Sequence, residues 1–294
     1  MKIRNGKYVY KDKLSMDKMH KFYDKVLTSL QIDYTDKYID TAYGKTHILI
    51  VGDERKPPIF TLHGGNGISP LNIKLFLPLL KNYYIIAPDV IGMPGKSAPY
   101  RNLNTRGDDF GIWISEIMNE LNLKKSFFAV SSYSAAMMLS LAKIAPERIE
   151  KAMLLVPSGI AHGAIFPMIS KMMIPFVKYY FKPSKRTLRG ILETMVSESD
   201  ELWCEFFDLM MSSYKMEMRA PKEYSKKELS EFHAPIIIFA SNEDIFFPAD
   251  KVFSKAEKIF SGDLQIHKIG GKHLPSGRTM TAVCEKTIEF FETQ

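Results

Sequence analysis

The sequence predicts an α/β fold with a mostly parallel central sheet and helices on both of its faces. Strand-length apolar runs alternate with helical segments over residues 58–156 and again over residues 235–293. These runs, such as "PIIIFA", are apolar throughout, which is expected for strands covered on both faces. Between the two series, residues 160–232 are apolar in patches and rich in methionine, which predicts an inserted α-helical cap.

The elements follow in order along the chain. Residues 15–30 have the pattern of an amphipathic helix, and "YIDTAY" and "THILIV" follow as two short strands. The first alternating series predicts strands at 58–62, 83–87, 126–130 and 151–156, with helices near 70–80, 105–121 and 133–145. The second series predicts strands at 235–240 and 264–269, with helices at 249–259 and 278–293. Right-handed crossovers connect such parallel strands. In sheets of this kind, ligands bind beyond the carboxyl ends of the strands.

The predicted organisation is one core with two additions. Residues 37–159 and 233–294 form the core, residues 160–232 form the helical cap, and residues 1–36 form an N-terminal helical extension. A chain of 294 residues suits one large domain with an insertion. The cap methionines either line an adaptable apolar pocket or pack the interior of the cap.

Composition and charge exclude several classes of protein. A hydrophobic fraction of 46% and a charged fraction of 25% are typical of a globular protein rather than a disordered one. The net charge of +7 is concentrated at the start, where the first 25 residues hold eight Lys or Arg against three Asp. A solvated terminal helix explains this excess, and basic patches interleaved with aromatic residues, as in nucleic-acid-binding proteins, are absent from the sequence.

Cysteine spacing and hydropathy predict a cytoplasmic protein that needs no metal or cofactor. Cys204 and Cys284 have no metal-binding or redox spacing, and we expect buried thiols in a reducing compartment. The N-terminus lacks the apolar segment of a signal peptide. The longest apolar candidate for membrane contact, residues 164–177, is short and interrupted by Pro167 and Lys171, so we expect no stable membrane insertion.

The stretch "FFAVSSYSAAM" contains the candidate nucleophile. Ser132 lies between the predicted strand and helix, where a strained turn presents a serine above the sheet. The usual pattern is small-x-Ser-x-small; centring on Ser134 fits it locally, whereas centring on Ser132 puts Val130 two residues before the serine. Ser132 is favoured because Ser134 would shorten the helix before Pro146. Helix capping is the alternative role for such a serine.

Oxyanion donors are expected in "TLHGGNG", which follows an apolar strand. Glycines allow backbone N–H groups to approach a ligand closely. In the strand-turn-helix arrangement, one donor comes from such a loop, here Gly65, and the other from the residue after the nucleophile, here Tyr133. His63 precedes the nucleophile in the chain and is interpreted as a structural histidine.

The acid and the base follow the last two strands. Asp244 in "SNEDIFFP" is the candidate acid, with the adjacent Glu243 as the alternative. His273 in "KIGGKHLPSG" is the candidate base, whereas His267 lies within the predicted strand. The order serine, acid, histidine along the chain is that of the nucleophile-elbow architecture. Each signal is weak alone, and together they predict a serine nucleophile with its base and acid.

These segments closely resemble the α/β-hydrolase superfamily over residues 37–160 and 233–293. "YYIIAPDVIGMPGKS" is similar to the family's Asp-x-x-Gly-x-x-Gly-x-Ser segment, and the segment around Ser132 aligns to the elbow without gaps. Val130 and Ser134 stand where the family usually has glycines, and Lys272 where a glycine usually precedes the histidine.

The resemblance implies a serine hydrolase, similar to carboxylesterases, that cleaves a small ester with an apolar part through an acyl-enzyme. Ser132, Asp244 and His273 would form the catalytic triad, and Gly65 and Tyr133 the oxyanion hole. One alternative is a catalytically weak or inactive protein that binds a small apolar ligand. Others are an amide, peptide or carbon–carbon bond hydrolase with the same triad, and a membrane-peripheral lipase that uses the basic N-terminus and residues 164–177. Substrate identity, substrate-binding residues and oligomeric state stay open.

Overall fold

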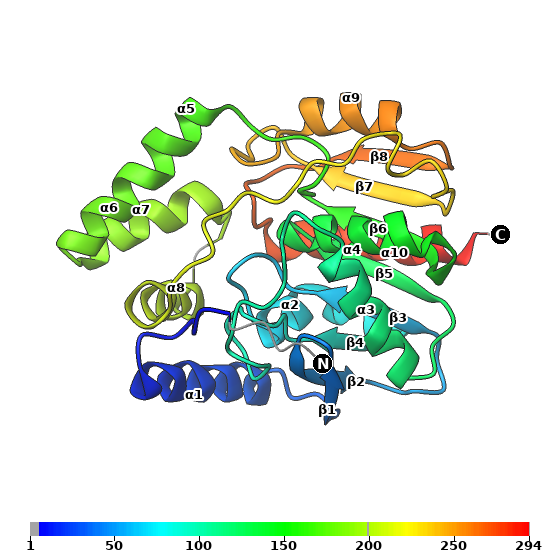
Figure 1. Cartoon of the computed structure of the whole chain (residues 1–294). Coiled ribbons are helices and arrows are strands. Elements are labelled where there is room, and N and C mark those ends of the chain that lie inside the picture. Colours follow the sequence, from blue (N-terminus) through cyan, green and yellow to red (C-terminus); the bar gives the residue numbers. More distant parts are fainter. Residues whose placement is uncertain (1–5, 199, 294) are drawn as a thin grey trace.

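The computed structural model describes residues 6–198 and 200–293, which form an eight-stranded sheet flanked by helices (Figure 1). Residues 1–5 of the expected N-terminal extension lie outside the described residues. The strand order is β1-β2-β4-β3-β5-β6-β7-β8; β1 and β2 are antiparallel to their neighbours and the other pairs are parallel. This confirms the predicted mostly parallel sheet. The strands are β1 Tyr34–Thr41, β2 Gly44–Val51, β3 Pro58–Leu62, β4 Tyr84–Pro88, β5 Ser126–Ser131, β6 Ile149–Leu155, β7 Ile236–Ala240 and β8 Leu264–Lys268.

The helices divide into those that cover the sheet and those of the insertion between β6 and β7. The first group comprises α1 Lys13–Ser29, α2 Ser69–Phe76, α3 Asp109–Glu120, α4 Tyr133–Ile144, α9 Ala249–Ile259 and α10 Gly277–Glu292, with the short 3₁₀ turns Leu77–Lys81 and Pro146–Arg148. The inserted group comprises α5 Ile165–Met168, a π-helical turn Ile169–Met173, α6 Ile174–Phe181, α7 Lys185–Met195 and α8 Glu201–Ser213.

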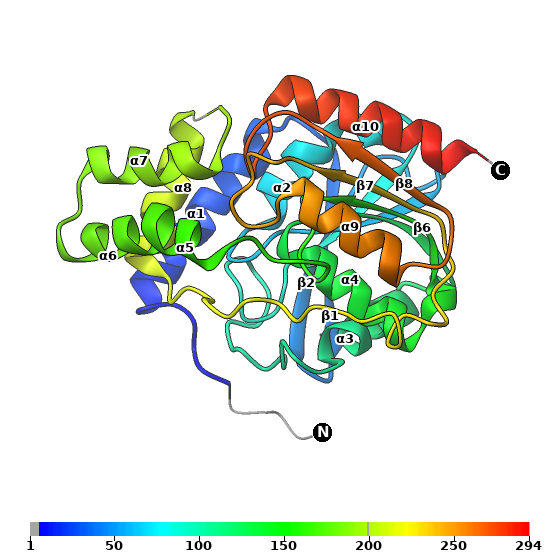
Figure 2. The same cartoon turned by 90° about the horizontal axis from the view of Figure 1, so that it is seen from above.

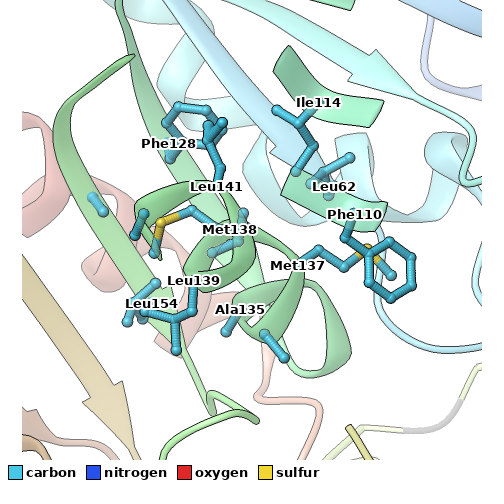
Figure 3. Close-up of a cluster of buried hydrophobic side chains, with 14 of the residues drawn as sticks. Leu62, Phe110, Ile114, Phe128, Ala135, Met137, Met138, Leu139, Leu141 and Leu154 are labelled. Atoms are coloured by element: carbon cyan, nitrogen blue, oxygen red, sulfur yellow. The ribbon is translucent and has the colours of Figure 1, made fainter. Parts of the chain in front are cut away.

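Each central strand contributes apolar side chains to two cores, one on each face of the sheet. In β5, Phe128 and Val130 belong to the core under α3 and α4, while Ala129 between them belongs to the opposite core with α1, α2 and α10. Figure 3 shows the first of these cores, with Phe128 and Leu62 from the sheet against side chains of α3 and α4. Strands that must be apolar on both sides read as continuous apolar runs, which explains why they could be located in the sequence.

The N-terminal helix α1 is part of the folded body. Its inner face is fully packed, and Phe22 stacks on Phe206 of α8 with ring centroids 5.8 Å apart. The Asp12 side chain caps the helix by accepting the Ser15 N–H at 2.7 Å. The lysines of α1 remain exposed on its outer side.

The insertion is helical only in its first part. Residues 214–232 were expected to continue the helical cap, but α8 ends at Ser213 and the chain continues without a helix to β7. Here the backbone bonds to distant segments instead: Lys215 N–H donates to Val9 O at 2.8 Å, and Tyr224 N–H donates to Gly159 O at 2.8 Å. Pro221 also lacks the N–H that a helix requires.

The inserted helices lie beyond the carboxyl ends of the parallel strands. Figure 2 shows α5, α6 and α7 on the side opposite the C-terminus, with the arrowheads of β7 and β8 pointing toward them. Among the helices of residues 6–198 and 200–293, none has both the length and the apolar character needed to cross a membrane.

Candidate functional site

Ser132 is the single residue between the end of β5 and the start of α4. Its backbone has φ 56° and ψ −125°, a strained conformation for a residue other than glycine. The neighbouring strand fixes this turn, because Ser132 N–H donates to Leu155 O at 2.9 Å and Ser132 O accepts the N–H and hydroxyl of Ser158 at 3.1 and 2.9 Å. The sharp turn holds the Ser132 side chain at the carboxyl edge of the sheet.

Val130 and Ser134, which replace the glycines usual in this turn, are accommodated without distortion of it. Val130 is a fully buried residue of β5. Ser134 is also fully buried, and its hydroxyl lies 2.7 Å from both Leu62 O and Ser131 O while it accepts the Ser131 N–H at 3.0 Å. The hydroxyl of Ser134 therefore ties α4 to the ends of β3 and β5, and Ser132 is the serine whose hydroxyl faces His273.

The structure brings Ser132, His273 and Asp244 into one hydrogen-bonded chain. His273 Nε2 lies 2.8 Å from Ser132 Oγ, and His273 Nδ1 lies 2.8 Å from Asp244 Oδ2. Asp244 is buried, and its second oxygen accepts the Phe246 N–H at 2.8 Å. Because an ionised Asp244 can only accept, it selects the tautomer with the proton on Nδ1 and leaves Nε2 free to accept the serine proton.

The alternative acid and base lie elsewhere. Glu243 accepts the Gly271 N–H at 3.0 Å and is exposed. His267 lies in β8 and stacks on Phe239 with ring centroids 5.3 Å apart. The His273 ring instead contacts the rings of Phe246 and Phe247, with centroids 4.9 and 5.7 Å away.

The loop that carries His273 is attached to the end of α7. Leu274 N–H donates to Met195 O at 2.8 Å, and Ser197 N–H donates to Leu274 O at 2.9 Å. The hydroxyl of Ser197 accepts the Lys272 N–H at 2.8 Å. The residues on both sides of His273 are therefore held by the inserted helices.

The glycine loop packs directly on Ser132 and Tyr133. Gly67 N–H donates to Gly64 O at 3.0 Å, which closes a turn with Asn66 in the left-handed region at φ 57°. A Cβ atom on Gly65 would lie 3.0 Å from the Tyr133 ring, so a larger residue would have to displace that ring by a few tenths of an ångström. Tyr133 begins α4, and its N–H has no carbonyl partner within that helix.

His63 anchors the glycine loop to the end of β4. Its Nε2 accepts the Val90 N–H at 3.0 Å, so its Nδ1 carries the proton and donates to Gly64 O at 2.9 Å. Burial lowers the pKa of His63, which keeps the ring neutral in this role. This is the structural position that the sequence indicated.

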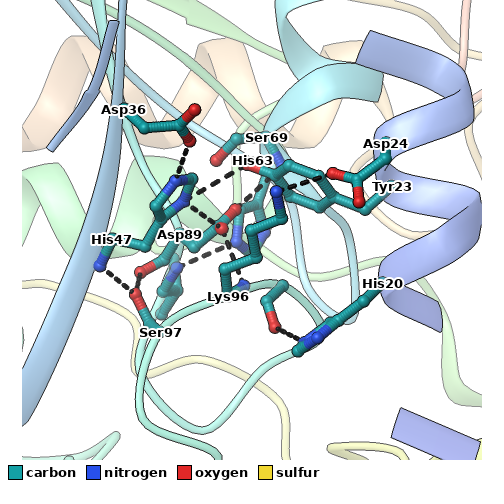
Figure 4. Close-up of polar contacts among 12 residues, drawn as sticks. His20, Tyr23, Asp24, Asp36, His47, His63, Ser69, Asp89, Lys96 and Ser97 are labelled. Carbon is teal, nitrogen blue, oxygen red and sulfur yellow. Dashed lines mark hydrogen bonds and ion pairs between the residues drawn. The ribbon is translucent and has the colours of Figure 1, made fainter. Parts of the chain in front are cut away.

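A second histidine and two carboxylates lie behind the loop (Figure 4). His47 is buried between Asp36, 2.5 Å from Nε2, and Asp89, 2.9 Å from Nδ1. Burial alone lowers the pKa of His47, but the two carboxylates outweigh it and raise the pKa above its ordinary value. Burial likewise raises the pKa of Asp89, but His47, His63 and the Lys96 N–H together outweigh burial and lower it. Asp89 also accepts the Ser69 N–H at 3.3 Å, which connects this group to the segment after the glycine loop.

Residues 214–219, which we call the strap, hold the glycine loop from the other side. Asn66 Nδ2 donates to Glu217 O at 3.0 Å, and Glu217 N–H donates to Asn66 Oδ1 at 2.6 Å. The Glu217 carboxylate is itself bound by Arg219 at 2.7 Å and lies 3.7 Å from Arg101. Burial raises the pKa of Glu217, but the bonds from Arg219 outweigh it and lower the pKa. The insertion therefore contacts loops of the site at two places, the end of α7 and the strap beyond α8.

Beside the strap is a cavity of about 10 Å³, lined in part by Arg101, Thr105 and Glu217. This volume suits a single water molecule. The Tyr133 and Thr105 hydroxyls are buried without a hydrogen-bond partner among the described residues, and burial raises the pKa of Tyr133. The cavity is too small to hold a substrate.

Within residues 6–198 and 200–293, no three His, Cys, Asp or Glu side chains are grouped so that they could bind a metal ion. Cys204 and Cys284 are free thiols; Cys284 is buried as expected, whereas Cys204 is half-buried.

Sequence reasoning named Ser132, Asp244 and His273, which the structure brings together, but it missed the strap and the Asp36–His47–Asp89 group. A signal for Asn66 was present, because asparagine is favoured at the left-handed position of such a turn. No signal connected it with Glu217, which is 151 residues away.

Comparison with known proteins finds a matching family and similar proteins of known structure. A family model described as the alpha/beta hydrolase fold matches residues 57–231. Carboxylesterase YbfK of Bacillus subtilis (strain 168) is 24% identical over 287 residues, 93% of each chain. The crystal structure of naproxen esterase from Bacillus subtilis has a TM-score of 0.78 at 18% identity, covering 94% of this chain and 98% of that one. A hydrolase of 2-hydroxy-6-oxo-6-phenylhexa-2,4-dienoate from Rhodococcus sp. strain RHA1 has a TM-score of 0.68 at 19% identity, covering 90% of this chain and all of that one.

Proposed function

This chain belongs to the α/β-hydrolase fold family, and we propose that it is a serine hydrolase that cleaves a carboxylic ester of a small molecule. The observation that supports the proposal most directly is the chain of 2.8 Å contacts from Ser132 through His273 to Asp244. A serine hydroxyl becomes a nucleophile when a base removes its proton and a third group orients that base. The matched relatives named carboxylesterases support an ester as the substrate.

In the proposed mechanism, Ser132 Oγ attacks the ester carbonyl while His273 Nε2 takes its proton. The imidazolium that forms is stabilised by Asp244, and it then donates the proton to the departing alcohol. His273 then removes a proton from a water molecule, which attacks the acyl carbonyl. The second tetrahedral intermediate breaks its bond to Ser132 Oγ and releases the carboxylic acid, and His273 returns the proton to Ser132. The N–H groups of Gly65 and Tyr133 stabilise the negative oxygen of the tetrahedral intermediates.

We propose that the substrate has an apolar part and that the protein acts in the cytoplasm. The aromatic rings of Phe246 and Phe247 against His273 favour an apolar group beside the base. The free thiols Cys204 and Cys284 suit a reducing compartment.

Labelling with a fluorophosphonate, which forms a covalent bond with an activated serine, tests the proposal. The wild type and Ser131→Ala should be labelled, because Ser131 is a buried neighbour outside the proposed triad, whereas Ser132→Ala should not. A wild type that resists labelling would favour a binding protein that holds a small apolar ligand without turnover.

Hydrolysis of aryl esters with short and long acyl chains then tests the acid and the base. Removing a triad member costs about 10⁴–10⁶ in kcat. We expect this loss in His273→Ala and Asp244→Asn, but not in Glu243→Gln, whose carboxylate accepts the Gly271 N–H and is exposed. Equal losses in the two carboxylate variants would contradict the assignment of Asp244. Labelling without hydrolysis of any ester would favour an amide, peptide or carbon–carbon bond as the substrate bond.

A further inference from the structure

The outermost helical segment of the insertion exposes an unusual amount of apolar surface. Eight of the fifteen large apolar side chains that are exposed among the described residues lie within residues 165–181, which include α5 and α6. The six most exposed are Phe181 (80%), Phe166 (79%), Tyr180 (70%), Ile165 (69%), Ile174 (59%) and Val177 (52%). Contiguous exposed apolar side chains on a folded protein mark an interaction surface.

These side chains lie on one face of a helix whose other face is packed. Met172 and Tyr179 are buried in the core shared with α7 and α8, and the Tyr179 hydroxyl bonds to Asp208 of α8. Exposed residues recur at intervals of four from Ile169 through Met173 and Val177 to Phe181, as expected for a helical stripe. We call the exposed apolar side chains of residues 165–181 the outer face; in Figure 2 the helices α5 and α6 that carry them lie on the periphery of the molecule.

The charged side chains of the segment that carries the outer face have one sign. Residues 163–192 contain six basic residues and no Asp or Glu. All six are exposed, and none forms an ion pair within residues 6–198 and 200–293. They are Lys171, Lys178, Lys182, Lys185, Arg186 and Arg189. The outer face therefore combines apolar and aromatic side chains with uncompensated positive charge.

We propose that the outer face docks on an anionic lipid surface. A helix with a basic polar side and aromatic or aliphatic residues on the other lies in the interface between headgroups and acyl chains, with the apolar residues inserted and the basic residues beside the phosphates. A second copy of the chain is a poorer partner, because the same six positive charges would meet across the contact. The proposal does not rest on the hydrolase activity.

Co-sedimentation with vesicles tests the proposal. We expect the wild type to bind vesicles of equal parts phosphatidylglycerol and phosphatidylcholine, and to bind pure phosphatidylcholine weakly. Roughly 0.5 M salt should release it from the anionic vesicles, because exposed charges are strongly screened at that ionic strength. Phe166→Ser with Phe181→Ser should weaken binding about tenfold or more, because two inserted rings are lost. Lys178→Gln with Lys182→Gln should weaken it about 25-fold, at roughly fivefold per charge.

Matched controls separate the outer face from general surface properties. Ile112→Ser with Ile144→Ser removes two exposed apolar residues of α3 and α4, and Lys226→Gln with Lys227→Gln removes two exposed charges that follow the inserted helices and the strap; both should bind like the wild type. The lysine pairs remove no apolar contact, so they report on binding even if the Phe166→Ser, Phe181→Ser protein is unstable.

Two results would overturn the proposal. One is a wild type that does not bind the anionic vesicles, or that binds them as well after the Phe166→Ser and Phe181→Ser changes. The other is a wild-type dimer in light scattering that becomes a monomer in this double variant, because the outer face would then be covered by a second copy.

Discussion

The variant Asn66→Gly tests how the position of the glycine loop affects catalysis, without changing the backbone conformation of the loop. Glycine adopts φ 57° without strain, so the turn itself should persist in the variant. What is lost is the pair of hydrogen bonds, at 3.0 and 2.6 Å, between the Asn66 side chain and the backbone of Glu217. The change therefore detaches the loop from the strap and leaves the proposed donor Gly65 in place.

The size of the effect follows from these two bonds. Each contributes about 0.5–1.5 kcal/mol net, so the preference of the loop for its present position should weaken by about 1–3 kcal/mol. That lowers the equilibrium constant for the aligned position by about 5- to 150-fold, which is also the largest loss that the aligned population can show. Loss of a complete oxyanion donor costs about 10²–10³ in kcat, which sets the upper limit.

The assay measures kcat and KM for an aryl ester, and inhibition by a trifluoromethyl ketone, which forms a tetrahedral oxyanion on the serine. We expect kcat to fall within the range above, KM to change little, and the inhibition constant of the ketone to rise in parallel with the loss in kcat. An effect limited to folding would not raise the inhibition constant of the remaining native enzyme.

Asn122→Gly is the matched control. Asn122 also has a left-handed backbone, at φ 55°, but it is exposed just beyond α3. Its replacement should leave kcat unchanged while it introduces the same glycine into the unfolded chain. If Asn66→Gly matched this control in kcat and in ketone inhibition, the strap would have no part in positioning the oxyanion hole.

Three further outcomes are expected. Ser134→Ala should lower the free energy of unfolding in urea by about 1–3 kcal/mol, because buried backbone groups lose their partner. Ser197→Ala removes one bond to the backbone of Lys272 and should lower kcat up to about tenfold with KM unchanged, measured with the same ester. The raised pKa of His47 means that charged His47 contributes stability below pH of about 6.5, which is lost as pH rises through its folded pKa. In urea titrations the wild type should therefore exceed His47→Gln by more at pH 6 than at pH 9, and a gap that widens at pH 9 would contradict the charged pairing with Asp89.

The core of the fold could be predicted because its physical requirements are local. A strand covered on both faces must be apolar at every position, so "PIFTL" and "PIIIFA" could be recognised directly, and the observed strands Pro58–Leu62 and Ile236–Ala240 agree with them. The segment after Ser213 could not be predicted, because its backbone partners are distant residues such as Val9 and Gly159. Residues 214–232 were included in the predicted cap together with the methionine-rich segment before them, but long-range pairing determined their structure.

In the site, too, some features could be predicted from the sequence and others could not. Chain order and strand ends were sufficient to bring Ser132, Asp244 and His273 together as candidates, since the ends of parallel strands meet at one edge. Nothing local indicates that the buried His47 would be shared between Asp36 and Asp89, because such pairing depends on which strands are neighbours. These charged groups behind the glycine loop are the part of the site that only the structure reveals.

The insertion contacts the site at two loops, and this connects the outer face with the proposed chemistry. At the end of α7, Met195 and Ser197 hold the loop of His273; beyond α8, Glu217 holds the glycine loop through Asn66. Between these two attachments the chain consists of α8 alone, whereas α5 and α6 precede the first one. A displacement of the outer helices would therefore reach His273 through α7 before it reached the glycine loop, because α8 is also packed on α1 and is held by it. If lipid docking altered hydrolysis, the change should consequently appear in steps that depend on the base, and Ser197→Ala should weaken that response more than Asn66→Gly.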